Sequence, residues 1–137
     1  MSLTAKVATH LPMLRRYARA VTGSQTSGDA YVAAVLEALI ADVSSFPEAK
    51  SNRIALYQMF SSIFTTATIE VKPIESPFAW EKRTAANLAA VSPLPRQAFI
   101  LSAVEEFSNE DIAEVLAVSE ERVSELLSEA AAEISEQ

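Results

Sequence analysis

The chain has 137 residues, 50% of them apolar, and a formal net charge of −7. This supports one domain or two small ones around a real core, and the negative charge argues against a nucleic-acid partner. Cysteine is absent, His10 is the sole histidine and only two glycines occur, which excludes disulfides, paired-imidazole zinc sites and Gly-rich phosphate loops.

Alanine, leucine and glutamate are abundant and no period-two alternation appears, so we predict an all-α fold. A short helical lead-in over residues 2–9 is expected to precede a helix with Pro12 in its first turn. Leu14 and Tyr17 belong to the apolar stripe of that helix. The arginines beside the stripe form either a solvated basic face, which is the commoner case, or a contact surface for phosphate or an acidic protein; they are Arg15, Arg16 and Arg19.

A polar turn over residues 23–28 leads into a predicted second helix at 27–41, which includes Leu36. The apolar face of this helix is broad enough to be buried from two sides. A third helix is expected to start at Phe46-Pro47 and to carry Tyr57, Phe60 and Phe64. We interpret these aromatic residues as core; unstacking of DNA bases is the alternative, but no Lys and Arg cluster accompanies them.

Pro73 and Pro77 interrupt helix propensity, and we predict a linker over residues 69–77. The linker divides the chain into a helical subdomain at 1–68 and a second one at 78–137. The second subdomain is expected to hold a helix from Phe78 to about Val91, another starting near Pro95, and then a helix-turn-helix.

The segment 108–132 is typical of a helix-turn-helix, because Ser108 and Ser119 are placed as N-caps of two apolar-periodic stretches. Its charge is unusual for that motif. Residues 108–137 contain nine acidic residues and one basic residue, Arg122. A recognition helix needs Lys or Arg against phosphates, so this charge indicates a DNA-binding shape used for another purpose.

No catalytic constellation is visible, and we predict neither an enzyme nor a cofactor or metal site. The carboxylates of the last helix are interpreted as a solvated face, with weak binding of a hard cation as the alternative. The most apolar window, residues 30–41, is too short to span a bilayer. The N-terminus lacks the apolar region of a signal peptide, and we expect a cytoplasmic protein.

The run LPRQAFILSAVEEFSNEDIAEVLAVSEERVSELLSEA resembles region 4 of extracytoplasmic-function sigma factors. The run LRRYARAVTGSQTSGDAYVAAVLEAL resembles sigma region 2, and more closely the sigma-like domain of PhyR-type response regulators. The resemblance covers nearly the whole chain and implies a sigma2-like and a sigma4-like subdomain. Positions that are usually basic in a working recognition helix correspond to Ser124, Leu126 and Glu129, and Ala117 stands where the turn commonly has glycine.

The resemblance implies a sigma-factor mimic that binds NepR, a small anti-sigma factor, and so releases the stress sigma factor by partner switching. In that family a receiver domain covers the mimic until an aspartate of the receiver domain is phosphorylated. The sequence shows no receiver pattern, so we expect an excised domain or a natural truncation that binds NepR without phosphorylation. The alternative is a genuine extracytoplasmic-function sigma factor or helix-turn-helix regulator that binds promoter DNA.

We predict a hydrophobic seat for an amphipathic partner helix, formed by both subdomains. Leu126 occupies a position that faces DNA in sigma factors, so we expect its side chain to point outward and to anchor the partner. Most of the other candidates could equally belong to the core. The predicted partner-binding residues are Leu14, Tyr17, Leu36, Val115, Arg122, Val123, Leu126 and Leu127.

Overall fold

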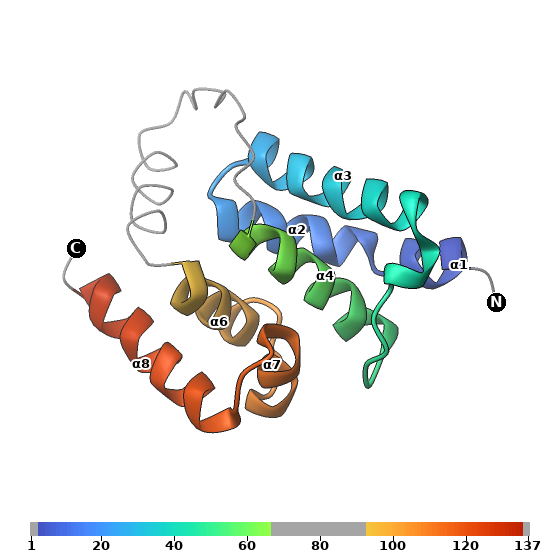
Figure 1. The fold of residues 1–137 in the computed structure, drawn as a ribbon. Coiled ribbons are helices and arrows are strands. Elements are labelled where there is room, and N and C mark those ends of the chain that lie inside the picture. The colour runs from blue at the N-terminus through green and yellow to red at the C-terminus, as the bar shows by residue number, and fades with distance from the viewer. Residues whose placement is uncertain (1–2, 67–92, 136–137) are drawn as a thin grey trace.

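The computed structural model describes residues 3–66 and 93–135. Every regular element within these ranges is helical (Figure 1), which confirms the predicted all-α class. The predicted linker at 69–77 and the helix from Phe78 lie outside the described residues. The helices are α1 (Leu3–Ala8), α2 (Leu11–Thr22), α3 (Gln25–Ala41), the short 3-10 helix η1 (Val43–Ser45), α4 (Asn52–Thr66), α6 (Pro93–Ala103), α7 (Asn109–Leu116) and α8 (Glu120–Ser135).

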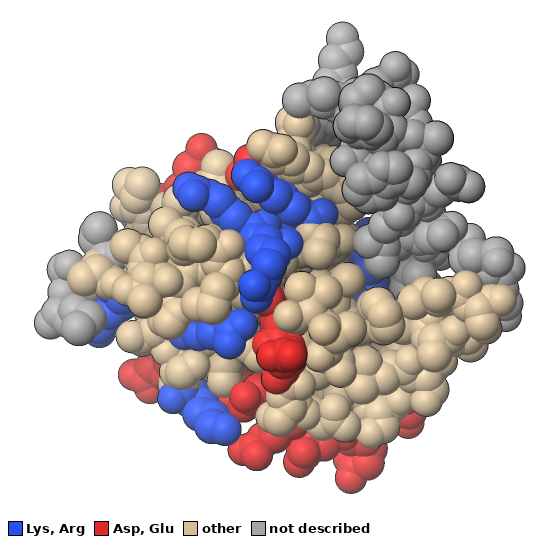
Figure 2. All heavy atoms as spheres, turned by 180° about the vertical axis from the view of Figure 1, so that it is seen from behind, with Lys and Arg blue, Asp and Glu red and all other residues tan. Residues whose placement is uncertain are grey.

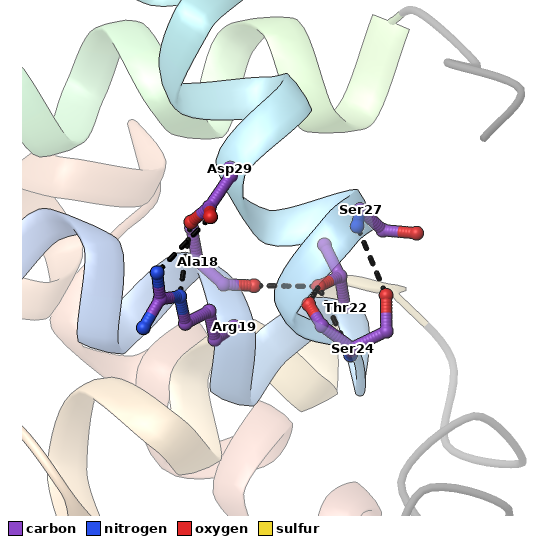
Figure 3. A network of polar contacts seen from close by, with 6 residues as sticks. All are labelled: Ala18, Arg19, Thr22, Ser24, Ser27 and Asp29. Atoms are coloured by element: carbon purple, nitrogen blue, oxygen red, sulfur yellow. Dashed lines mark hydrogen bonds and ion pairs between the residues drawn. The ribbon is translucent and has the colours of Figure 1, made fainter. Parts of the chain in front are cut away.

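The corner between α2 and α3 is tighter than predicted. Gly23 ends α2 in the left-handed conformation, with φ of 80°, which glycine adopts without strain. Ser24 then caps α3, because its hydroxyl accepts a hydrogen bond from the Ser27 N–H at 3.0 Å (Figure 3). The predicted turn over residues 23–28 was therefore too long, and Gly28 lies inside the helix.

Gly28 permits a close approach of α2 and α3. A Cβ atom at this position would lie 2.6 Å from the Arg19 backbone nitrogen and 2.9 Å from the Ala18 carbonyl carbon. Beside this contact the Arg19 guanidinium donates to both carboxylate oxygens of Asp29, at 2.9 and 3.0 Å (Figure 3). The hydrogen bond from Arg19 lowers the pKa of the Asp29 carboxyl below its ordinary value.

The third long helix, α4, begins later than predicted. Its first residue is Asn52, and the Ser51 hydroxyl accepts a hydrogen bond from the Ile54 N–H at 3.1 Å. This side-chain cap satisfies a backbone N–H in the first turn of α4. It therefore fixes the start of the helix after Ser51 and not at Phe46-Pro47. The interpretation of the aromatic residues as core is confirmed for Tyr57 and Phe60, whose side chains are fully buried.

The helix-turn-helix forms as predicted. The Ser108 hydroxyl accepts from the Asp111 N–H at 3.2 Å and starts α7, and the Ser119 hydroxyl accepts from the Arg122 N–H at 3.1 Å and starts α8. Between them Ala117 has φ of 58° and ψ of 45°, which is the left-handed conformation. For a residue with a Cβ atom this conformation costs about 1 kcal/mol of conformational free energy.

Ala117→Gly is expected to raise the free energy of unfolding by about 1 kcal/mol, because glycine relieves the strain of the turn. Urea unfolding followed by circular dichroism measures the change. Ala131→Gly is the matched control, since Ala131 is exposed within α8 and glycine there should cost about 1 kcal/mol. A loss of stability in both variants would contradict the strain at Ala117.

The two subdomains, residues 3–66 and residues 93–135, share one hydrophobic core. At the seam between them α4 lies against α7, and α2 lies against α6 (Figure 1). Polar bonds also cross the seam: the Gln58 amide donates to the Glu114 carbonyl at 2.7 Å, and the Arg96 guanidinium donates to the Val21 carbonyl at 3.0 Å. The seam therefore buries apolar residues of both ranges in one cluster.

Candidate functional site

The structure divides the predicted partner-binding residues into core and surface. Five of them belong to the shared core and are at most 3% exposed: Leu14, Tyr17, Val115, Val123 and Leu126. Leu36 and Leu127 are partly buried at the edge of that core. Arg122 keeps 39% of its side chain exposed. In this arrangement the accessible members are Leu36, Arg122 and Leu127.

The expectation that Leu126 points outward is wrong, because its side chain is 0% exposed. Leu126 follows Val123 by three residues and precedes Ala130 by four, so all three lie on one face of α8, and all three are buried. That face packs on α6 and α7. Helical spacing, and not the family position, correctly indicates the direction of this side chain.

The outward side of α8 is strongly acidic. Arg122 is the sole basic residue among residues 108–137, and its guanidinium contacts Glu125 and Glu129, both at 3.0 Å. These two carboxylates raise the pKa of Arg122. The positive charge is thus shared with neighbours on the same helix, and the helix that would enter a DNA groove presents carboxylates there.

An apolar surface that the sequence did not predict lies at the end of α3. Ile40 is 82% exposed and Val43, in η1, is 61% exposed. Leu36 lies one turn before Ile40 and is partly buried. We call these three residues the α3 outer surface. The inner face of α3 is buried. The broad apolar pattern predicted burial from two sides, whereas within the described residues nothing packs over this second face.

Many Lys and Arg side chains gather on one face of the molecule, and several of them are paired with carboxylates. Figure 2 shows Lys and Arg in a band across one face, with most of the visible Asp and Glu along its lower edge and some beside the band. Two of the three arginines of α2 are paired within the chain, since Arg19 bonds Asp29 and Arg16 bonds Glu105. Much of the positive charge on α2 therefore joins elements of the fold, in addition to forming a surface.

Glu105, which follows α6, has a side chain that is 0% exposed. Its carboxylate accepts hydrogen bonds from the Arg16 guanidinium and, at 2.5 Å, from the Tyr57 hydroxyl. The Arg53 guanidinium lies 4.0 Å from the same carboxylate. Burial raises the pKa of the Tyr57 hydroxyl, and the hydrogen bond to Glu105 adds to this effect. We call Arg16, Arg53, Tyr57 and Glu105 the Glu105 cluster.

Within residues 3–66 and 93–135, no three His, Asp or Glu side chains lie together as a metal site would need. None of the helices described there is long and apolar enough to cross a membrane.

The sequence matches two family descriptions: residues 7–61 match the Sigma2 domain of PhyR, and residues 88–137 match the sigma-like domain of the response regulator PhyR. The Phyllosphere-induced regulator PhyR of Methylorubrum extorquens is 39% identical over 98% of the chain and 50% of its own length. The chain thus spans about half the length of this curated relative.

Two solved relatives extend the comparison. The anti-anti-sigma factor PhyR of Bartonella quintana, solved in complex with the anti-sigma factor NepR, is 43% identical to this chain. The alignment covers 99% of this chain and 50% of the relative, with a TM-score of 0.86. Alone, the same protein gives a TM-score of 0.78, over 99% of this chain and 48% of its own. The PhyRSL–NepR complex of Sphingomonas sp. Fr1 aligns over 100% of this chain and 89% of its own, at 43% identity and a TM-score of 0.75.

Proposed function

This chain belongs to the PhyR family of sigma-like domains, and from that membership we propose that it is a sigma-factor mimic that binds a NepR-type anti-sigma factor. By sequestering that factor it releases the stress sigma factor, which is partner switching. The observation that carries the proposal is the full-length match to a relative solved in complex with NepR, at 43% identity. The activity of the domain is binding, without catalysis, and its compartment is the cytoplasm.

The charge of the helix-turn-helix supports a protein partner over promoter DNA. Positively charged side chains supply most of the non-specific affinity for a duplex through counterion release. Here the exposed positions of α8 include Ser124, Glu125 and Glu129, and its one arginine is bonded to carboxylates. An approaching phosphate backbone would meet repulsion at the helix that should read the bases.

We place one contact of the partner at the α3 outer surface. An amphipathic helix docks its apolar side on exposed apolar residues, and Ile40 and Val43 are the most exposed large hydrophobic residues that the structure describes. Leu36, which the sequence already indicated, lies beside them at the edge of the core. A receiver domain, expected in the full-length protein because the relatives are about twice as long, would control access to the mimic.

The proposed function is tested by titrating a NepR-type protein into this chain in a calorimeter, beside a gel shift with promoter DNA at about 50 mM salt, where phosphate attachment is strong. We expect binding of the protein and no sequence-specific complex with DNA. Salt-sensitive, specific DNA binding without binding of the NepR-type protein would refute the mimic and favour a working sigma factor.

Ile40→Asp is expected to weaken binding of the NepR-type protein by at least tenfold, about 1.4 kcal/mol, because it places a charge in an apolar contact. The melting temperature should stay nearly unchanged, since Ile40 is 82% exposed. Ser128→Asp is the control, because it adds the same charge at an exposed position of α8. Equal affinities of both variants would place the docking surface elsewhere.

A further inference from the structure

The Glu105 carboxylate joins the two subdomains. It belongs to the second subdomain, whereas the partners that the structure gives it, Arg16, Arg53 and Tyr57, belong to the first. Arg16 is 89 residues away in the chain. A carboxylate removed from water is strongly unfavourable unless positive charges and hydrogen-bond donors replace the solvent. Separation of the subdomains would remove all of these partners together.

Aromatic rings from both subdomains also contact Arg53, one of the residues beside the Glu105 carboxylate. The Arg53 guanidinium lies 4.4 Å from the ring centroid of Phe107 and 5.4 Å from that of Tyr57. The two rings are themselves in contact, with centroids 5.3 Å apart. Phe107 follows α6 and Tyr57 lies on α4. Arg53 is thus held by the carboxylate and by ring faces that meet only when the seam is closed.

The other charged contacts across the seam are of a different kind. Lys50 lies 3.1 Å from Asp111 and 3.9 Å from Glu110, and its side chain is 56% exposed. Exposed pairs of this type contribute little because water and salt screen them. Apolar contacts are non-directional, whereas hydrogen bonds to a buried carboxylate have defined distances and angles. The Glu105 cluster therefore selects one arrangement among those that would bury similar apolar area.

The relative from Bartonella quintana has been solved both in its NepR complex and alone. This chain aligns with that relative at a TM-score of 0.86 in the complex and 0.78 alone. We propose that Glu105 is a positioning residue, which holds the two subdomains in the partner-binding arrangement before the partner arrives. The positioning role of Glu105 is inferred from the structure of this chain. Only the effect of Glu105 on affinity for a NepR-type protein rests on the proposed function.

The test compares Glu105→Gln with Glu106→Gln. The first substitution removes the buried charge and keeps the shape, while the second makes the same change at the exposed neighbour. Because the chain lacks cysteine, spin labels at Ala33→Cys and Ser128→Cys report one distance between α3 and α8. Electron paramagnetic resonance should give a narrow distribution in the parent and in Glu106→Gln, and a broader or longer one in Glu105→Gln.

Affinity for the NepR-type protein is measured on the unlabelled variants. We expect Glu105→Gln to bind about tenfold more weakly, because apparent affinity scales with the population of the competent arrangement, and Glu106→Gln to bind like the parent. An unchanged distance distribution in folded Glu105→Gln would overturn the positioning role. A broadened distribution with unchanged affinity would overturn its link to the partner.

If Glu105→Gln fails to fold, Arg16→Ala replaces it, since 55% of the Arg16 side chain is exposed and its loss leaves Tyr57 and Arg53 beside the carboxylate. Arg16→Lys, which keeps the charge, should restore part of the narrow distribution. If the parent chain binds no NepR-type protein, the proposed function fails, while the distance measurement still decides the positioning role.

Discussion

Leu126→Ala should lower the free energy of unfolding by about 3 kcal/mol, as expected for a leucine removed from a filled core. Leu126 is 0% exposed and lies on the face of α8 that packs on α6 and α7. The truncation removes buried apolar area and leaves a cavity that the surrounding helices can only partly close. Urea unfolding monitored by circular dichroism gives the difference.

Leu127→Ala is the control for that experiment, because the neighbouring leucine is only partly buried and should lose clearly less stability. Unaltered stability of Leu126→Ala combined with weaker partner binding would contradict the buried position. That result would instead restore Leu126 as an exposed anchor.

Gly28→Ala should lower the free energy of unfolding by about 2 kcal/mol, which is typical of overpacking. The added methyl group would lie 2.6 Å from the Arg19 nitrogen and 2.7 Å from the Arg19 Cα, and these are backbone atoms that cannot rotate away. Alanine is favoured over glycine within a helix by about 1 kcal/mol, so the expected sign is opposite to that of helix propensity alone. Thermal and urea unfolding both measure it.

Ala33→Gly measures the propensity difference on the same helix, at an exposed position, and should cost about 1 kcal/mol. If Gly28→Ala proved more stable than the parent chain, α2 and α3 would have to tolerate a wider separation than the structure shows.

Features fixed by neighbouring residues could be predicted from the sequence. Ser108 and Ser119 cap their helices as expected, because the cap is a bond between residues three apart. Pro12 lies in the first turn of α2 for a similarly local reason. The start of α4 was predicted incorrectly, because two local signals competed there. Phe46-Pro47 was the predicted start, whereas the cap at Ser51 begins the helix.

Features that depend on distant residues could not be predicted in this way. Gly28 appeared to be part of a turn, but its role is to admit the backbone of α2, which the sequence does not reveal. Glu105 carries no periodic signal, because its partners come from two other helices. The exposure of Ile40 depends on which face of α3 the fold leaves uncovered. Candidate binding residues chosen for apolar character therefore included five that belong to the core.

The core that runs through both subdomains has a consequence for the lifetime of the protein in a cell. A ligand that binds only the folded chain adds about 2.7 kcal/mol at a concentration a hundredfold above its dissociation constant. Because helices α2 and α8 contribute to the same cluster of buried residues, a partner seated on one half also protects the other half from unfolding. The bound chain would then expose sites to proteases about a hundredfold less often than the free chain, so capture of the partner would also preserve the domain that captures it.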